Sequence, residues 1–261
     1  MTSYITHLSS AFTDTTLLKL VRDPAIALGT RLLFDFKSGY CNPNAAGNLA
    51  DAAAFVNLVD GAPGATLIAG AQKLINDAAT TGGIRAPGVD ASGQAISLGI
   101  TYNLYPTNHS FIALAWVKCP SVALNKAYQT IFSYGVTGSS QSGLFFIDSG
   151  ADGKSPRVVA NNQANVPLYN SVPGFTVDVV HQVGVAWRPG FFDVILDGVV
   201  VASFANVNVS LLDMSTSNMS ALSNRQSATL YRLLLEDLIV SGRSASQAAA
   251  ADFSAATGRF S

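Results

Sequence analysis

The sequence is poor in charged residues and in cysteine. Only 12% of its 261 residues are Asp, Glu, Lys or Arg, about half of the roughly 25% found in an ordinary soluble domain. The two cysteines, Cys41 and Cys119, are too few for a disulfide framework, so we expect free thiols. Fifteen Lys and Arg face sixteen Asp and Glu without a basic run. This balance argues against a nucleic-acid partner.

Glutamate is scarcer still, because Glu236 is the single one. Retaining glycoside hydrolases need two carboxylates about 5–5.5 Å apart. The neighbouring Asp237 does not provide the second, since adjacent strand residues point to opposite faces of a sheet. The sequence also has no zinc-binding histidine pair and no phosphate-binding glycine loop. We therefore expect a protein that is not an enzyme.

Long apolar runs and targeting signals are absent as well. No segment reaches the length of about 20 apolar residues that spans a bilayer. The first residues, MTSYITHLSS, lack the charged and apolar regions of a secretory signal peptide. We expect neither a membrane partner nor export by such a signal.

The strongest positive pattern covers residues 181–204. Apolar and small or polar residues alternate from His181 to Trp187, a turn follows at Pro189-Gly190, and alternation resumes from Phe192. Asp197-Gly198 is a pair that two-residue hairpins prefer. The segment predicts an antiparallel meander of three strands.

This meander and five other segments together resemble a laminin-G-like, concanavalin A-like jelly-roll domain of the kind found in bacteriophage virion proteins. The other segments, in order, are 31–60, 110–118, 130–134 with 143–148, and 233–244. The resemblance covers roughly residues 31–255. It implies an all-β fold: an antiparallel jelly-roll β-sandwich with a short N-terminal extension and a short C-terminal helix.

The chain is therefore divided into an N-terminal arm, residues 1–30, and a sandwich, residues 31–261. Helices are expected at 14–21, 45–59 and 246–256. The first would carry four apolar residues, which we propose for assembly or docking: Leu17, Leu18, Leu20 and Val21. Packing of this segment on its own sandwich is the open alternative.

Apolar residues make up 49% of the sequence, with a mean hydropathy of +0.31, which is ample for one large core. We assign core positions from the strand pattern. They are Trp116, Val117, Phe132, Phe145, Val185, Trp187, Val194, Leu196, Val201 and Ile239.

Two kinds of ligand site follow from the lectin-like resemblance. A glycan site needs aromatic platforms with amide or hydroxyl partners, for which the candidates are Tyr102, Tyr105, Asn161, Asn162 and Tyr169. These tyrosines could equally cap the core and bond locally. A calcium ion could be held by Asp148 and Asp152, although Asp and Gly also suit a plain turn. We otherwise expect no cofactor.

Low charge favours burial of much of the surface in an assembly. The sequence thus predicts a non-enzymatic structural protein of a bacteriophage particle, as a capsid decoration, cement, tail or fibre component. Its partners would be copies of itself and other virion proteins, and its location the virion after synthesis in the host cytoplasm. The alternative is a carbohydrate-binding module that adsorbs to a host-surface glycan.

Overall fold

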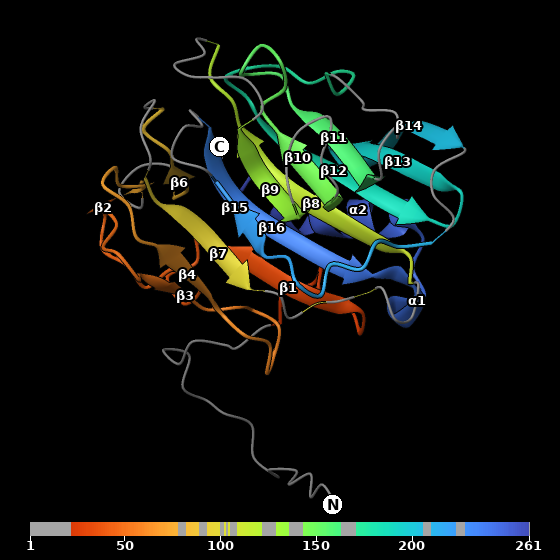
Figure 1. Cartoon of the computed structure of the whole chain (residues 1–261), viewed down its shortest axis with the longest axis horizontal. Helices are drawn as coiled ribbons and strands as arrows, with labels where there is room; N and C mark the ends of the chain where they lie inside the picture. Colours follow the sequence, from red (N-terminus) through yellow and green to blue (C-terminus); the bar gives the residue numbers. More distant parts are fainter. Residues whose placement is uncertain are drawn as a thin grey trace, which may run out of the picture.

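The computed structural model describes residues 22–77, 82–88, 93–99, 102, 104, 109–121, 129–135, 143–162, 171–205, 210–222 and 228–260. In this part of the chain, two antiparallel sheets pack face to face, and a C-terminal helix lies against the outer face of one of them (Figure 1). The expected all-β sandwich with a short C-terminal helix is confirmed.

The first sheet has nine strands in the described residues, in the order β14-β13-β12-β8-β16-β6-β5-β2, with β1 also paired to β16. Its longest strands, β8, β12 and β16, lie side by side at its centre. The bounds are β1 Thr30–Asp35, β2 Gly47–Asn48, β5 Ile75–Asn76, β6 Ile84–Arg85, β8 Phe111–Lys118, β12 Val180–Arg188, β13 Phe191–Leu196, β14 Val199–Ala205 and β16 Thr229–Asp237.

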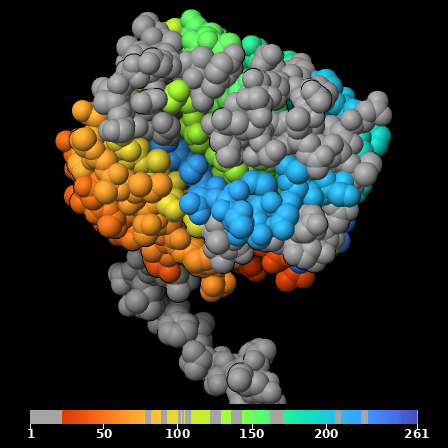
Figure 2. Space-filling view, in the orientation of Figure 1, coloured from red at the N-terminus to blue at the C-terminus, as the bar shows by residue number. Residues whose placement is uncertain are grey.

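The second sheet has seven strands in the same part of the chain, in the order β11-β10-β9-β15-β7-β4-β3. Its bounds are β3 Ala54–Phe55, β4 Ala65–Ile68, β7 Ala95–Gly99, β9 Thr130–Gly135, β10 Gly143–Asp148, β11 Arg157–Asn162 and β15 Met219–Ala221. The segment 210–222, light blue in Figure 2, reaches the surface on the face shown there.

The main core lies between the two sheets. Inward-facing side chains of both sheets form one buried cluster, as alternation along the strands requires. The core prediction is confirmed for Val117, Phe132, Phe145, Val185, Trp187, Val194 and Leu196, and Val201 packs against the same cluster.

Two core assignments are wrong. Trp116 is buried, but on the outer face of the first sheet, because its neighbour Val117 points into the main core. Ile239 is 60% exposed. The closing strand ends before it, at Asp237, whose carboxylate accepts the backbone N–H groups of Ile239 and Val240 and so starts a helix.

Two helices follow that strand: α1 Leu238–Ser241 and α2 Ala245–Ala256. Ser244 begins α2 through a capping box with Gln247. The helix expected at 246–256 is confirmed. Its buried alanines, Ala248 and Ala249, pack on the outer face of the first sheet.

The expected meander is also confirmed, as β12, β13 and β14. The turn between β13 and β14 has φ of 48° at Asp197 and 81° at Gly198, the left-handed pair that a tight hairpin needs.

The helix expected at 45–59 is wrong. That stretch contains the short strands β2 and β3 and a turn at Ala52, with φ of 60°. The side chain of Asn57 accepts the backbone N–H groups of Leu33 and Val59. Such side-chain bonds to the backbone compete with a helix.

Part of the proposed N-terminal arm lies against the sandwich. Ala25 is fully buried in the cluster under α2, and Asp23 forms an ion pair with Arg232 of β16. The proposed assembly residues Leu17, Leu18, Leu20 and Val21 lie outside the described residues. None of the described helices has the length and apolar content needed to cross a membrane.

Candidate functional site

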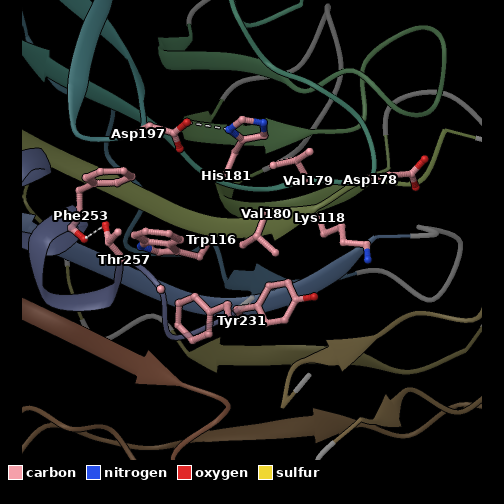
Figure 3. A pocket seen from close by; sticks show the side chains of 12 residues that line it. Trp116, Lys118, Asp178, Val179, Val180, His181, Asp197, Tyr231, Phe253 and Thr257 are labelled. Atoms are coloured by element: carbon pink, nitrogen blue, oxygen red, sulfur yellow. Dashed lines mark hydrogen bonds and ion pairs between the residues drawn. The ribbon is translucent and has the colours of Figure 1, made fainter. Parts of the chain in front are cut away.

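The outer face of the first sheet carries a hollow beside the C-terminal end of α2. Its volume is about 430 Å³, within the usual range of ligand sites of about 300–1,000 Å³. We call it the aromatic hollow (Figure 3). It is lined by Trp116, Lys118, Asp178, Val179, Val180, His181, Asp197, Tyr231, Phe253, Thr257, Gly258 and Phe260.

Four aromatic rings form its base. Trp116 of β8 stacks on Phe253 of α2, with ring centres 5.5 Å apart and an angle of 11° between the planes. Phe260 meets Trp116 edge-on at 5.4 Å and Tyr231 of β16 at 5.2 Å. Trp116, Tyr231 and Phe260 are nearly buried. Phe253 is partly exposed.

Polar contacts beneath these rings fix their positions. The Trp116 Nε1 donates to Asp252 Oδ2 at 2.8 Å, and Gln182 Nε2 donates to the same oxygen at 2.7 Å. Arg232, fully buried, donates to Asp252 Oδ1 at 2.7 Å. A buried donor or carboxylate is tolerated when it is paired in this way.

The same guanidinium also holds the segment before β1. Arg232 donates to both carboxylate oxygens of Asp23, at 2.7 and 2.9 Å. Burial acts to raise the pKa of Asp23, but the hydrogen bonds and charge of Arg232 outweigh it, so the pKa is lowered. Arg259 adds a bond to Asp35 at 2.6 Å. The base of the hollow therefore rests on an ion-pair cluster that joins β1, β16, α2 and the N-terminal segment.

One polar edge of the hollow is formed by His181 and Asp197. The His181 Nδ1 lies 2.7 Å from Asp197 Oδ2, as drawn in Figure 3, and its Nε2 lies 2.8 Å from the hydroxyl of Thr176. The backbone N–H of Thr176 donates to the same Nε2 at 3.2 Å. His181 thus ties the segment before β12 to the β13–β14 turn.

The other edge consists of Lys118, Asp178 and Val179. Asp178 is exposed, and hydrogen bonds from Ser121, with a smaller contribution from the charge of Lys118, lower its pKa. Val179 is 48% exposed. The hollow thus combines an apolar aromatic base with charged and hydroxyl groups at its margin.

Two carboxylates outside the hollow, those of Glu236 and Asp237, are held by basic partners. Glu236 is bound by Arg243, which donates from Nε at 2.8 Å. Asp237 lies 2.5 Å from His109 Nδ1 and 3.1 Å from Arg31. Both acidic groups are buried in ion pairs, an arrangement that favours a structural role.

Of the five proposed glycan residues, the structure describes the side chains of Tyr102 and Asn161, and both bond to other parts of the chain. Tyr102 packs against the main core, and its hydroxyl accepts a hydrogen bond from Asn57. Burial raises the pKa of Tyr102 to about 12. Asn161 is fully buried, and its amide binds the backbone of Ser210 and Leu212. Tyr105, Tyr169 and the side chain of Asn162 lie outside the described residues.

The two proposed calcium ligands both bind donors of the chain itself. Asp148 is buried and paired with Arg157 at 2.6 Å, and burial raises its pKa against the opposing effect of that arginine. Asp152 accepts the backbone N–H groups of Lys154 and Ser155. In the part of the chain that the structure describes, no three His, Cys, Asp or Glu side chains gather as a metal site.

The residues of the hollow were missed by the sequence patterns, which placed Trp116 in the main core. One signal was present: Trp116 and Val117 are adjacent on a strand, so one of them had to face outward. A large aromatic residue, Phe253, within an alanine-rich helix was a second signal, because it indicates that the helix packs against another apolar group.

No family model matches the chain, and no curated protein matches it by sequence. Solved structures match it by fold at low identity. A sialidase from Trypanosoma rangeli is 14% identical, with a TM-score of 0.57, over 88% of this chain and 33% of that one. The chain thus spans about a third of the length of the sialidases it matches.

Two further matches are binding domains. Domain 4 of AbnA, a GH43 extracellular arabinanase from Geobacillus stearothermophilus, was solved in complex with arabinotriose. It is 12% identical, with a TM-score of 0.51, over 87% of this chain and 99% of that one. The binding domain of botulinum neurotoxin serotype D is 10% identical, with a TM-score of 0.57, over 87% of this chain and 51% of that one. The chain is therefore similar in fold to lectin-like β-sandwich domains.

Proposed function

We propose that this protein is a non-catalytic carbohydrate-binding module and that the aromatic hollow is its binding site. The observation that carries the proposal is the hollow itself. A partly exposed ring, Phe253, lies over a base of packed aromatics, with Asp197, Lys118 and Thr257 at the margin. Glycans need this combination of an aromatic surface and polar partners.

The individual groups suit a sugar. The exposed side of Phe253 can stack on the apolar face of a pyranose or furanose ring. Thr257 is exposed and donates its hydroxyl proton to the carbonyl of Phe253 at 2.6 Å, which leaves its oxygen able to accept from a sugar hydroxyl. Domain 4 of the arabinanase, which this chain covers almost completely, was solved with arabinotriose. That match supports the choice of a saccharide as ligand.

Catalysis is not part of the proposal. A retaining glycosidase needs a pair of carboxylates about 5–5.5 Å apart with room for a sugar between them. The carboxylates of Glu236 and Asp237 are instead bound by Arg243, Arg31 and His109. We expect no hydrolysis of sialosides or arabinans by the purified chain.

A saccharide screen tests the proposal. We expect the purified protein to bind at least one saccharide on a glycan array, and the Phe253→Ala variant to lose that binding. Alanine keeps the helix, since it has the highest helix propensity. The matched control is Phe191→Ala, which removes another partly exposed phenylalanine. Phe191 is the first residue of β13, at the end of that strand away from Asp197. Absence of binding to any saccharide, or equal loss in both variants, would refute the proposed site.

A structural role in a bacteriophage particle is our second proposal. It rests on the sequence resemblance and on the charged fraction of 12%. Exposed apolar side chains such as Leu28, at 82%, and Ile239, at 60%, also suit contacts with copies of the chain or other virion proteins. Light scattering of the purified protein tests self-association, and mass spectrometry of purified particles tests the location.

A further inference from the structure

We propose that the aromatic hollow takes a neutral saccharide and discriminates against acidic sugars such as sialic and uronic acids. The inference rests on the proposed function and adds the chemical class of the ligand. Its basis is the charge of the groups that line the hollow.

The first step is the charge of His181. The backbone N–H of Thr176 is only a donor, and it points at the Nε2 of His181 at 3.2 Å. The Nε2 must therefore accept, so it carries no proton. The single ring proton is then on Nδ1 and is donated to Asp197 Oδ2 at 2.7 Å. In this arrangement the imidazole is neutral and Asp197 keeps its negative charge.

The second step is the balance at the margin. Lys118 and Asp178 carry opposite charges and both line the same edge of the hollow. Their charges offset one another. Among the described residues, the hydrogen-bond donors to Asp197 are the neutral His181 and the backbone N–H of Gln182, at 2.9 Å. One negative charge at the margin is therefore left without a cationic partner among the lining residues that the structure describes.

The third step is the cluster below the base. Arg232 and Arg259 are shared there among the carboxylates of Asp23, Asp35 and Asp252. With two cations facing three carboxylates, this group of ion pairs carries no net positive charge. The carboxylate of Asp252 accepts the indole N–H of Trp116 at 2.8 Å.

A ligand carboxylate or sulfate in the hollow would therefore meet two carboxylates, Asp197 and Asp178, against a single ammonium, that of Lys118, and no guanidinium among the lining residues that the structure describes. Recognition of carboxylates in proteins generally uses such a group, above all arginine. This charge pattern distinguishes the hollow from what a sialic-acid site requires, although a sialidase solved with sialic acid is among the chains of similar fold.

An array carrying neutral, sialylated, uronic-acid and sulfated glycans tests the inference with the full-length protein. We expect the bound glycans to be neutral and their binding to be lost in Phe253→Ala. Acidic glycans bound in a Phe253-dependent manner, in preference to neutral ones, would overturn this inference and leave the proposed function intact. No bound glycan of any class would overturn both.

A charge variant sharpens the test. Asp197→Asn removes the negative charge and keeps a side chain that tolerates a positive φ before glycine. We expect affinity for the acidic analogue of the bound neutral glycan to rise roughly threefold at low salt, with little change for the neutral glycan. Asp60→Asn, at an exposed position outside the hollow, is the control and should change neither affinity.

Should Asp197→Asn unfold, as shown by its circular-dichroism spectrum, Asp178→Asn serves in its place. Asp178 lies at the opposite edge and is exposed, so its replacement does not disturb the β13–β14 turn. The same gain for acidic glycans is expected. If a folded variant kept the same ratio of affinities for acidic and neutral glycans, the result would contradict the proposal that negative charge at the margin of the hollow disfavours acidic glycans.

Discussion

Trp116 and Asp252, 136 positions apart in the sequence, are joined by a hydrogen bond of 2.8 Å from the indole Nε1 to the carboxylate. This bond connects β8 to α2 and fixes the ring that forms the centre of the aromatic hollow. The same carboxylate accepts from Gln182 and Arg232, so one acidic side chain positions three elements.

Loss of that carboxylate should destabilise the protein strongly. Asp252→Ala leaves the buried guanidinium of Arg232 and the indole N–H of Trp116 without a shared acceptor. We expect the free energy of unfolding, measured by urea denaturation, to fall by about 3–5 kcal/mol. Asp60→Ala, at an exposed turn, should change it by about 0.5 kcal/mol or less. A similar small change in both variants would show that the cluster contributes little.

The main core gives a second prediction, at Trp187. The side chain is fully buried between Phe111 and the rest of the core. Trp187→Ala should lower the free energy of unfolding by about 3–5 kcal/mol. Trp187→Phe should lower it much less, because phenylalanine keeps most of the ring volume and the Nε1 of Trp187 has no hydrogen-bond partner among the described residues. If Trp187→Ala and Trp187→Phe lowered the stability equally, as measured by thermal or urea unfolding, the result would contradict this account of the core.

The pH dependence of stability should reflect Asp237. Burial acts to raise its pKa, but hydrogen bonds from His109, the backbone of Val240 and Arg31 outweigh burial and lower it below the usual 3.8. A lowered pKa in the folded state stabilises the protein above the pKa of the unfolded chain. We therefore expect stability to fall as the pH drops through and below about 4. Asp237→Asn should be less stable at pH 7 and lose less stability on acidification.

The N-terminal segment gives a prediction about assembly. Asp23 and Ala25 both contact the sandwich, and a deletion of residues 1–21 spares them. Deletion of residues 1–21 should therefore leave a folded domain, whereas deletion of 1–25 should destabilise it. If the second proposal is right, the shorter deletion also abolishes the self-association seen by light scattering. A full-length protein that is monomeric and fails to bind particles would contradict that proposal.

Much of the sandwich could be predicted because its signals are local. Strand alternation in 181–204, the Asp197-Gly198 turn and the Ser244 cap each involve residues close in sequence. The hollow could not be predicted in this way. Trp116 and Phe260 meet across 144 positions, and only the packing of α2 on the outer face brings them together. Likewise, the helix expected at 45–59 failed because Asn57 binds Leu33, a partner distant in sequence.

The proposed glycan site is tested most directly by the fluorescence of Trp116. The chain has two tryptophans, so Trp187→Phe leaves Trp116, in the base of the hollow, as the single reporter. We predict that titration with a saccharide selected on the array shifts its emission in a saturable manner, and that adding Phe253→Ala removes the shift. Saccharide binding detected by calorimetry with unchanged Trp116 emission would contradict a site in the aromatic hollow.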